Sequence, residues 1–397
     1  MRSDRVWREY GRPLLLLAEC LLHAALTLLS RVWERDRSIW LFGARNGIAF
    51  VDNAKYLYLH VAARHPEIRP VWLSKNEDVV RTLREAGYEA YYAYSLRGLY
   101  LNLRAGVVLL THRFNDVNLW CSGGAMVVML WHGSPLKTIG WDAEIQDAPR
   151  LVRAANRYIS RQIDCLTVTA EALIEPFASG LRIDPDRIVV TGYPRNDVLF
   201  EAIPGADIGS DTSVYEEVSR LAETHTIWLY LPTFRPTDTR ASEQLDFDEL
   251  ESFLEEADAY LLLKLHPNER LDGHGADYSR ILSIPEQSDV YPLLPYTDGL
   301  ITDYSSIYFD YLLLDKPIVF YAYDLERYRS ERGFYFEYES VTPGPVVTDF
   351  DGLVDQLERT LDHDEFADQR RRMRERFCQP STTSWSETVY RVISRRL

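Results

Sequence analysis

The sequence predicts an α/β fold of two Rossmann-like lobes with a cleft between them, preceded by an N-terminal amphipathic helix. Two observations predict the lobes: short apolar runs alternate with helix-like segments, and this alternation occurs in both halves of the chain. Strands that alternate with helices imply parallel sheets joined by right-handed crossovers. The length of 397 residues suits two or three domains. Two such sheets place a ligand in the cleft between them, at the carboxyl ends of their strands.

The first segment, residues 1–37, differs from the rest. Its apolar part, Pro13–Leu29, contains Glu19 and His23, so it is too short and too polar for a spanning helix. It lacks a small-residue cleavage site of the signal-peptide type. We expect an interfacial helix on an anionic leaflet, with packing on the protein body as the alternative. Arginines flank the run on both sides: Arg2, Arg5, Arg8, Arg12, Arg31, Arg35 and Arg37.

The first lobe is expected over residues 38–192 and the second over 193–360, with the boundary near Gly192–Leu199 and a helical segment over 361–397. Apolar runs predict the strands and amphipathic runs the helices. In the first lobe the strands are Ser38–Gly43, Arg69–Ser74, Gly106–Thr111, Ala125–Trp131, Gln162–Thr169 and Arg187–Thr191, with helices at Asn53–Ala63, Glu77–Ala86 and from Ala170. In the second lobe the strands are Thr226–Leu231, Ala259–Leu265, Gly299–Thr302 and Pro317–Tyr321, with helices at Asp246–Glu256 and Ser305–Leu314.

Composition excludes several classes of function. The net charge of -16 repels nucleic-acid phosphates, so no nucleic-acid partner is expected. The four cysteines contain no C-x-x-C pair, which gives zinc and redox sites no support and favours a reduced, intracellular setting. Only five of the basic residues are lysine. Such a composition is expected either for a protein that works at high salt concentration or for one encoded by a GC-rich genome.

Two histidine loops follow apolar strands and are expected to open on the cleft. In Trp131–Lys137, His132 is a candidate general base, and a histidine that only packs the loop is the alternative. Gly133 permits a sharp turn and Pro135 stiffens it, while Lys137 can neutralise a phosphate. In the second loop, Lys264–Pro267, His266 ends a strand that Pro267 stops, and it can donate to a diphosphate or face solvent.

Two further loops supply phosphate-binding chemistry. In Ile301–Ser306 a strand leads into a helix that Ser305 is expected to cap, and a helix N-terminus with hydroxyls suits phosphate. In Leu231–Arg235 the guanidinium of Arg235 can clamp a phosphate or form an ion pair. The predicted phosphate contacts are Arg235, Thr302, Asp303, Ser305, Ser306 and Lys137.

Motifs of other phosphate and metal chemistries are missing from the sequence. It has no Walker loop, no G-x-G-x-x-G after a strand and no nucleophile elbow. It also has no two-histidine metal spacing and no D-x-D motif of the type found in metal-using transferases. A preorganised cationic site without a metal or other cofactor is therefore the simpler mechanism.

Taken in order, the loops resemble the CDP-glycerol glycerophosphotransferase family, which includes teichoic-acid primases and polymerases and has a GT-B-like fold. The resemblance covers roughly residues 40–350. Its pieces are Phe42-Gly43 with Asp52–Leu57, Trp131–Lys137, Gly192–Asp197, Leu231–Arg235, Lys264–Pro267, Asp298–Ser306, Asp310, Lys316-Pro317 and Pro343–Pro345. Ser134 departs from the threonine often found in the family, and it keeps the hydroxyl.

The resemblance implies roles and partners. His132 is similar to the family's catalytic base, and His266, Ser305 and Ser306, with Arg235, are similar to contacts for the donor diphosphate. A CDP-alditol donor, a lipid-linked acceptor and no metal are implied, with the enzyme peripheral at the cytoplasmic face of the cell membrane. The expected reaction moves glycerol phosphate from CDP-glycerol to an acceptor hydroxyl. A CDP-ribitol transferase, a glycosyltransferase that uses a nucleotide sugar and a non-catalytic membrane-bound nucleotide scaffold stay open as alternatives.

Overall fold

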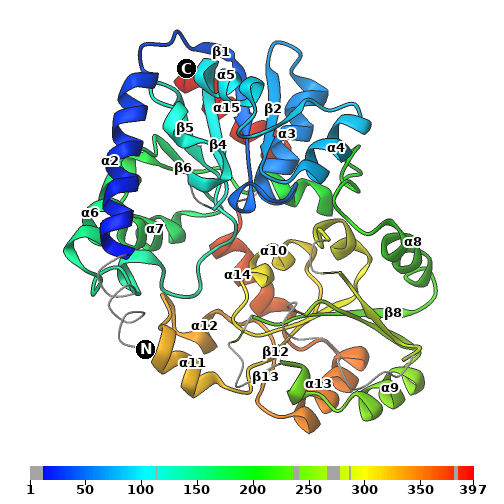
Figure 1. Cartoon of the computed structure of the whole chain (residues 1–397). Helices are drawn as coiled ribbons and strands as arrows, with labels where there is room; N and C mark the ends of the chain where they lie inside the picture. Colours follow the sequence, from blue (N-terminus) through cyan, green and yellow to red (C-terminus); the bar gives the residue numbers. More distant parts are fainter. Residues whose placement is uncertain are drawn as a thin grey trace, which may run out of the picture.

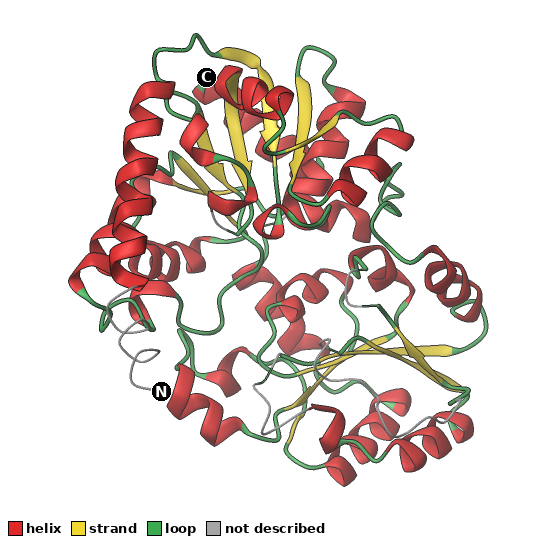
Figure 2. Cartoon of the chain, in the orientation of Figure 1, coloured by secondary structure: helices red, strands yellow, loops and turns green. Residues whose placement is uncertain are grey.

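The chain folds into two α/β lobes, one above the other in Figures 1 and 2. The structure is a computed structural model that describes residues 12–112, 114–233, 235, 241–265, 278–285, 288–379 and 383–397. Every strand pairing within each lobe is parallel. Helices cover both faces of the sheets, as parallel sheets require. The predicted fold class is therefore confirmed.

The first lobe, in the part of the chain that the structure describes, is built on seven strands in the order β3-β2-β1-β4-β5-β6-β7. The order reverses between β1 and β4, and ligands of such sheets bind where the order reverses, outside the carboxyl ends of the strands. These ends point toward the second lobe (Figure 1). The strands are β1 (Asp36–Phe42), β2 (Arg69–Ser74), β3 (Ala90–Tyr92), β4 (Ala105–Leu110), β5 (Met126–Met129), β6 (Cys165–Val168) and β7 (Ile188–Val190).

The described residues of the second lobe form a sheet of six strands in the order β10-β9-β8-β11-β12-β13, which repeats the reversal, here between β8 and β11. Two predicted strands, β8 and β11, have the bounds that their apolar runs indicate. The sequence did not predict β3, β10 and β13, which have only two or three residues each. The strands are β8 (Thr226–Leu231), β9 (Ala259–Leu263), β10 (Ile281–Ser283), β11 (Gly299–Thr302), β12 (Ile318–Tyr321) and β13 (Val346–Val347).

The helices agree with the predicted ones except near residue 305, where the helix begins later than expected. The helices α5, α6, α8, α11 and α12 were not predicted. The described helices are α2 (Arg12–Ser30), α3 (Asp52–Arg64), α4 (Glu77–Glu85), α5 (Leu96–Arg104), α6 (Arg150–Ser160), α7 (Ile174–Leu181), α8 (Thr212–Leu221), α9 (Phe247–Glu256), α10 (Ile307–Tyr311), α11 (Leu325–Arg332), α12 (Tyr338–Val341), α13 (Phe350–Asp362), α14 (Ala367–Phe377) and α15 (Trp385–Arg396).

Helix α2 presents its apolar residues outward, the reverse of a helix in a globular protein. Thr27 and Ser30 are buried, and the Ser30 hydroxyl accepts a hydrogen bond from the Gly123 amide at 2.7 Å. A Cβ on Gly123 would collide with the Thr27 carbonyl, so this glycine permits the close approach of α2. The large apolar side chains that stay exposed are Leu21, Leu22, Leu28 and Leu29, each 60–62% exposed, followed by Val32 and Trp33.

Helix α3 joins the two lobes. It is buried nearly all round, and its Lys55 and Tyr56 reach Asp289 of the second lobe. Lys55 Nζ lies 2.8 Å from the Asp289 carboxylate, and the Tyr56 hydroxyl donates to it at 2.7 Å. Burial alone raises the pKa of Asp289, but Lys55 and Tyr56 hold that pKa below its usual value. A buried carboxylate needs such partners because desolvation penalises its charge.

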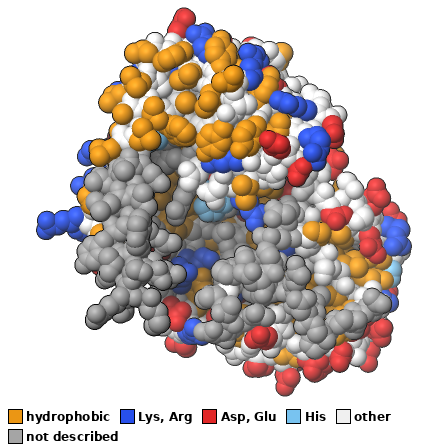
Figure 3. Space-filling view, in the orientation of Figure 1, with side chains coloured by type: hydrophobic (Ala, Val, Ile, Leu, Met, Phe, Trp, Pro, Cys, Tyr) orange, Lys and Arg blue, Asp and Glu red, His pale blue; other side chains and the backbone are white. Residues whose placement is uncertain are grey.

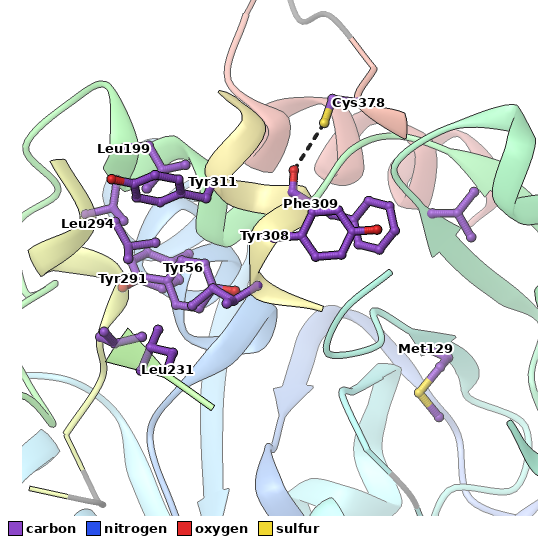
Figure 4. Close-up of a cluster of buried hydrophobic side chains, with 14 of the residues drawn as sticks. Tyr56, Met129, Leu199, Leu231, Tyr291, Leu294, Tyr308, Phe309, Tyr311 and Cys378 are labelled. Atoms are coloured by element: carbon purple, nitrogen blue, oxygen red, sulfur yellow. Dashed lines mark hydrogen bonds between the residues drawn. The ribbon is translucent and has the colours of Figure 1, made fainter. Parts of the chain in front are cut away.

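Apolar side chains surround this contact. Figure 4 shows Tyr56 of the first lobe beside Tyr291 and Leu294 of the second. In the same figure the Cys378 thiol donates to the Phe309 carbonyl at 3.3 Å. One cluster of buried hydrophobic residues runs through both lobes. The lobes are therefore held by a shared core as well as by charge.

The C-terminal helix α15 returns from the second lobe to pack on the first (Figure 1). Its Val389 and Ile393 join the core that contains Trp40 of β1. The Asp197 carboxylate accepts from the amides of Trp385 at 2.7 Å and Ser386 at 3.0 Å, and so caps the start of the helix. The last described segment is thus part of the first lobe's core.

We predict that Lys55→Ala destabilises the protein by about 3–5 kcal/mol, because it leaves the Asp289 charge buried without its cation. Urea unfolding at neutral pH measures this loss. Arg81→Ala is the control, because Arg81 pairs with Asp78 at 2.5 Å on the surface. We expect the control to change the free energy of unfolding by less than about 1 kcal/mol. Equal stability of Lys55→Ala and the wild type would contradict the role of this ion pair.

Candidate functional site

His132 lies just beyond β5, at the end of the first sheet that faces the second lobe. Its Nδ1 donates to the Thr111 carbonyl at 2.9 Å. In the neutral ring this bond places the proton on Nδ1 and the lone pair on Nε2, the form that a general base requires. The ring stacks on His112 with centroids 4.1 Å apart and on Trp131 at 4.6 Å. The bond and the stacking fix the orientation of the imidazole.

Asp116 holds the turn that carries the Thr111 carbonyl. One of its oxygens accepts from the amides of Thr111 and His112, both at 2.8 Å, and the other accepts from the Asn46 amide at 2.6 Å. Asp116 is fully buried. It supports His132 indirectly, by fixing the carbonyl to which the imidazole donates. No local pattern in the sequence points to a role for Thr111, His112 or Asp116.

Arg195 connects the His132 loop to both lobes. Its guanidinium is 2% exposed and contacts Asp52 at 2.5 Å, the His132 carbonyl at 2.9 Å and Asp310 of α10 at 2.7 Å. Asp310 also accepts from the Tyr291 hydroxyl at 2.8 Å. Only a planar fork with several N–H donors can serve three such acceptors at once. Its place inside the Gly192–Asp197 motif is the one sequence signal for Arg195, and no role was predicted for it.

Gly133 brings the two lobes into contact at the centre of the site. A Cβ at this position would collide with the hydroxyl of Ser306, which belongs to the second lobe. The next residues are buried as well, including Pro135. Gly133 therefore shapes the loop by leaving space for Ser306 of the second lobe.

The helix after β11 begins at Ile307, and its N-cap is Ser306. The prediction that Ser305 caps this helix is therefore wrong. Ser306 makes no side-chain capping bond. Within the described residues no hydrogen bond links the hydroxyl of Ser305 or Ser306 to another group, and both residues are half-buried. A role of these hydroxyls in ligand binding stays a prediction.

Thr302 and Asp303 are more deeply buried than a ligand contact requires. The Thr302 hydroxyl donates to the Leu231 carbonyl at 2.8 Å, across neighbouring strands. Both oxygens of Asp303 lie 2.9 Å from the Thr233 amide, which donates to them. Asp303 also accepts from its neighbour, the Tyr304 amide. Their hydrogen bonds link the loop after β8 to the loop after β11, so they shape the site rather than line it.

Arg235 is the most heavily paired of the predicted phosphate contacts. Its Nε and Nη2 donate to the two oxygens of Asp324 at 2.9 and 2.8 Å, and Nη1 contacts Asp303. The side chain is 2% exposed. The guanidinium fork is therefore engaged by carboxylates, as in the ion-pair alternative. A direct phosphate contact by Arg235 stays a prediction.

Lys137 lies where the His132 loop pairs with the second lobe. Lys137 forms an antiparallel bridge with Phe334, and the Thr138 amide donates to the Gly333 carbonyl at 3.2 Å. Burial lowers the pKa of Lys137, while the nearby Asp303 carboxylate opposes that shift. No carboxylate of the described residues lies within ion-pair distance of Nζ, which is 5.9 Å from the Tyr328 ring centroid. This cation is suited to an anionic ligand.

Figure 3 shows the site as a hollow between the lobes, with histidine and with lysine or arginine side chains in it. The structure thus brings together His132, Gly133, Lys137, Ser305 and Ser306 from two lobes. The predicted residues His266 and Pro267 lie outside the described residues, three and four positions after the end of β9. Their roles stay predictions.

Comparison with known proteins gives a family match over nearly the whole chain. A model of the CDP-Glycerol:Poly(glycerophosphate) glycerophosphotransferase family matches residues 25–395. The teichoic acid poly(glycerol phosphate) polymerase of Staphylococcus epidermidis is 29% identical over 361 residues, which cover 85% of this chain and 47% of that protein. The chain thus spans about half the length of that polymerase.

Other relatives are similar in length or in fold. The teichoic acid glycerol-phosphate transferase of Staphylococcus aureus is 27% identical over 394 residues. The match covers 95% of this chain and 97% of that protein. Ribitol-phosphate polymerases of the same organism also match. The solved wall teichoic acid polymerase TagF superposes with a TM-score of 0.75 at 24% identity, over 100% of this chain and 98% of that one. This likeness confirms the predicted GT-B-like fold.

We predict that Gly133→Ala destabilises the closed arrangement of the lobes, because the new methyl group collides with Ser306. Overpacking of this kind costs about 1–3 kcal/mol. Urea unfolding measures the loss, and the double variant Gly133→Ala with Ser306→Gly should recover the part that comes from the collision, while the strain of a side chain at the φ of +156° of residue 133 remains. Absence of any recovery in the double variant would show that the two loops do not meet as described.

Proposed function

The chain belongs to the CDP-glycerol:poly(glycerophosphate) glycerophosphotransferase family, and on that premise we propose that it transfers glycerol phosphate from CDP-glycerol to a hydroxyl of a membrane lipid-linked envelope glycopolymer or glycolipid. The single observation that carries the proposal is His132, held by the Thr111 carbonyl opposite the Ser305–Ser306 loop of the other lobe. A base on one lobe and hydroxyl donors on the other are the two halves that such a transfer needs.

In the proposed step, Nε2 of His132 takes the proton of the acceptor hydroxyl. The hydroxyl oxygen attacks the β-phosphorus of CDP-glycerol, so a new P–O bond forms to the acceptor. The bond between this phosphorus and the bridging oxygen breaks, and CMP leaves with that oxygen. Positioning by the two lobes and stabilisation of the phosphate charge supply most of the catalysis in reactions of this type.

The donor phosphates are proposed to bind Ser305, Ser306 and Lys137. The hydroxyls supply hydrogen bonds and the ammonium group supplies charge. Asp303 and Arg235 support this site indirectly, because the Asp303 carboxylate accepts from the Thr233 amide and the Arg235 guanidinium pairs with Asp324, which holds the donor-side loops in place. We propose that this site works without a metal, since Lys137 and the second-lobe loops provide the positive potential.

A ribitol donor is the second candidate, because ribitol-phosphate polymerases are also among the relatives of the chain. Glycerol and ribitol are both joined to the transferred phosphorus through an ester oxygen and differ only beyond it, so contacts with the phosphates do not distinguish the two donors. Incubation with CDP-glycerol, CDP-ribitol and UDP-sugars separates the candidates. Release of CMP supports an alditol-phosphate transferase, whereas release of a nucleoside diphosphate indicates a glycosyltransferase.

We also propose that α2 docks the enzyme on the cytoplasmic face of an anionic membrane. The leucines of α2 are exposed while its small polar residues face the protein, and Arg31 directly after the helix and Arg37 in β1 are exposed. Figure 3 shows hydrophobic side chains gathered over this upper lobe. An apolar face beside arginines suits a leaflet with anionic headgroups. Of the predicted segment 1–37, residues 1–11 lie outside the described residues.

None of the helices in the described part of the chain has the length and hydropathy that crossing a bilayer requires.

We predict that His132→Ala lowers transfer by at least about 10²–10⁴-fold, the usual contribution of a general base. CMP release with a lipid-linked acceptor measures the rate, and calorimetry with CDP-glycerol measures donor binding, which should persist. The control is His225→Ala, on the far side of the second lobe, where His225 contacts Asp258 at 3.4 Å. Near-normal turnover of the His132 variant would refute the base assignment, and donor binding without turnover by the wild type would favour the scaffold alternative.

We predict that the double variant Leu21→Glu with Leu28→Glu binds vesicles of anionic phosphatidylglycerol about 100-fold more weakly, since each buried leucine contributes at least about 1.5 kcal/mol. Vesicle co-sedimentation measures the change. Phe200→Glu is the matched control, because Phe200 is 61% exposed outside this helix and should not alter binding. If the double variant binds as tightly as the wild type, α2 is not the docking surface.

A further inference from the structure

A cluster of two histidines and a glutamate joins α3 to the C-terminal helix α15, away from the cleft. His60 lies in α3, His65 directly follows that helix, and Glu387 lies in the first turn of α15. His60 Nε2 is 3.0 Å and His65 Nε2 is 2.9 Å from the same oxygen of Glu387. All three side chains are mostly buried, at 14–19% exposed.

The three ligand atoms converge as a metal site requires. They lie within 4.8 Å of one another. A tetrahedral zinc site has ligand bonds of about 2.0–2.2 Å, which puts neighbouring ligand atoms about 3.3 Å apart. The two observed histidine–glutamate separations are slightly shorter than this, so a small outward movement of the side chains admits an ion. Two histidines and a glutamate form a known zinc ligand set that leaves a fourth position for water.

The groups behind the ligands are arranged to orient them. His65 Nδ1 lies 3.2 Å from Glu67 Oε1, so when an ion replaces the Nε2 proton, Glu67 holds the remaining proton on Nδ1 and the Nε2 lone pair is directed at the ion. A carboxylate behind a histidine ligand is the usual support of such a site. Tyr390 stacks on His65 at 3.4 Å and donates to Glu67 at 2.5 Å. The other oxygen of Glu387 accepts from Arg391 at 2.6 Å.

We propose that His60, His65 and Glu387 bind a divalent transition-metal ion, best matched by zinc, and that the ion fastens α15 to α3. The site is separate from the catalytic one, because His60 lies eight residues along α3 from Asp52, about 12 Å at 1.5 Å per residue. Its role is structural: it fixes the helix that returns from the second lobe to the core of the first.

The test uses the full chain without a histidine tag, stripped of metal with a chelator. Titration with zinc chloride by calorimetry should show one saturable site, and cobalt(II) should give the visible absorption of a tetrahedral ion. Zinc should raise the melting temperature. Glu387→Gln and His65→Gln should lose the site, while Glu67→Gln should weaken the affinity by about 10–100-fold.

Two controls separate this cluster from other histidines. His225→Gln and His132→Gln should both keep the site with unchanged stoichiometry and cobalt spectrum. The proposal is overturned if the wild type shows no saturable binding, or if Glu387→Gln binds zinc and cobalt as the wild type does. The first result would leave the three side chains as an ionic cluster, with Glu387 accepting hydrogen bonds from two imidazoles.

Discussion

The arrangement of the two lobes depends on the buried guanidinium of Arg195. It contacts a carboxylate from each lobe, Asp52 and Asp310, and the carbonyl of His132. In a water-excluded interface each of these charges would be costly alone. The same group therefore fixes the interface and the position of the base. The orientation of His132 toward the second lobe is a consequence of this charge pairing, which few substitutions of Arg195 would preserve.

Much of the fold was predictable from sequence because local patterns determine it. The apolar runs of β8 and β11 gave the bounds of those strands, and their ends gave the loops of the site. The helix start near Ser305 was wrong for a non-local reason. The Asp303 carboxylate bonds to the amides of Thr233 and Tyr304, which holds the chain in a turn before the helix can begin. No local pattern reveals that the partner of this carboxylate is 70 residues away.

The candidate site was predictable in its residues but less so in their partners. His132 was singled out because it follows a strand, yet the Thr111 carbonyl that sets its tautomer is 21 residues earlier. Arg235 was expected to face a ligand, and its engagement by Asp324 depends on a contact over 89 residues. The sequence also could not show which way the α2 leucines face, because an apolar stripe has the same spacing whether it faces the protein core or the outside.

The return of α15 to the first lobe has a consequence for synthesis of the chain. Val389 and Ile393 complete a core whose other members, such as Trp40, precede the end of β7 at Val190. About 200 residues separate these parts, and a ribosome working at about 5–20 residues per second needs about 10–40 s to make them. During that interval the first lobe exposes an unfilled apolar surface. The nascent chain is therefore open to aggregation or to a chaperone until the second lobe has emerged.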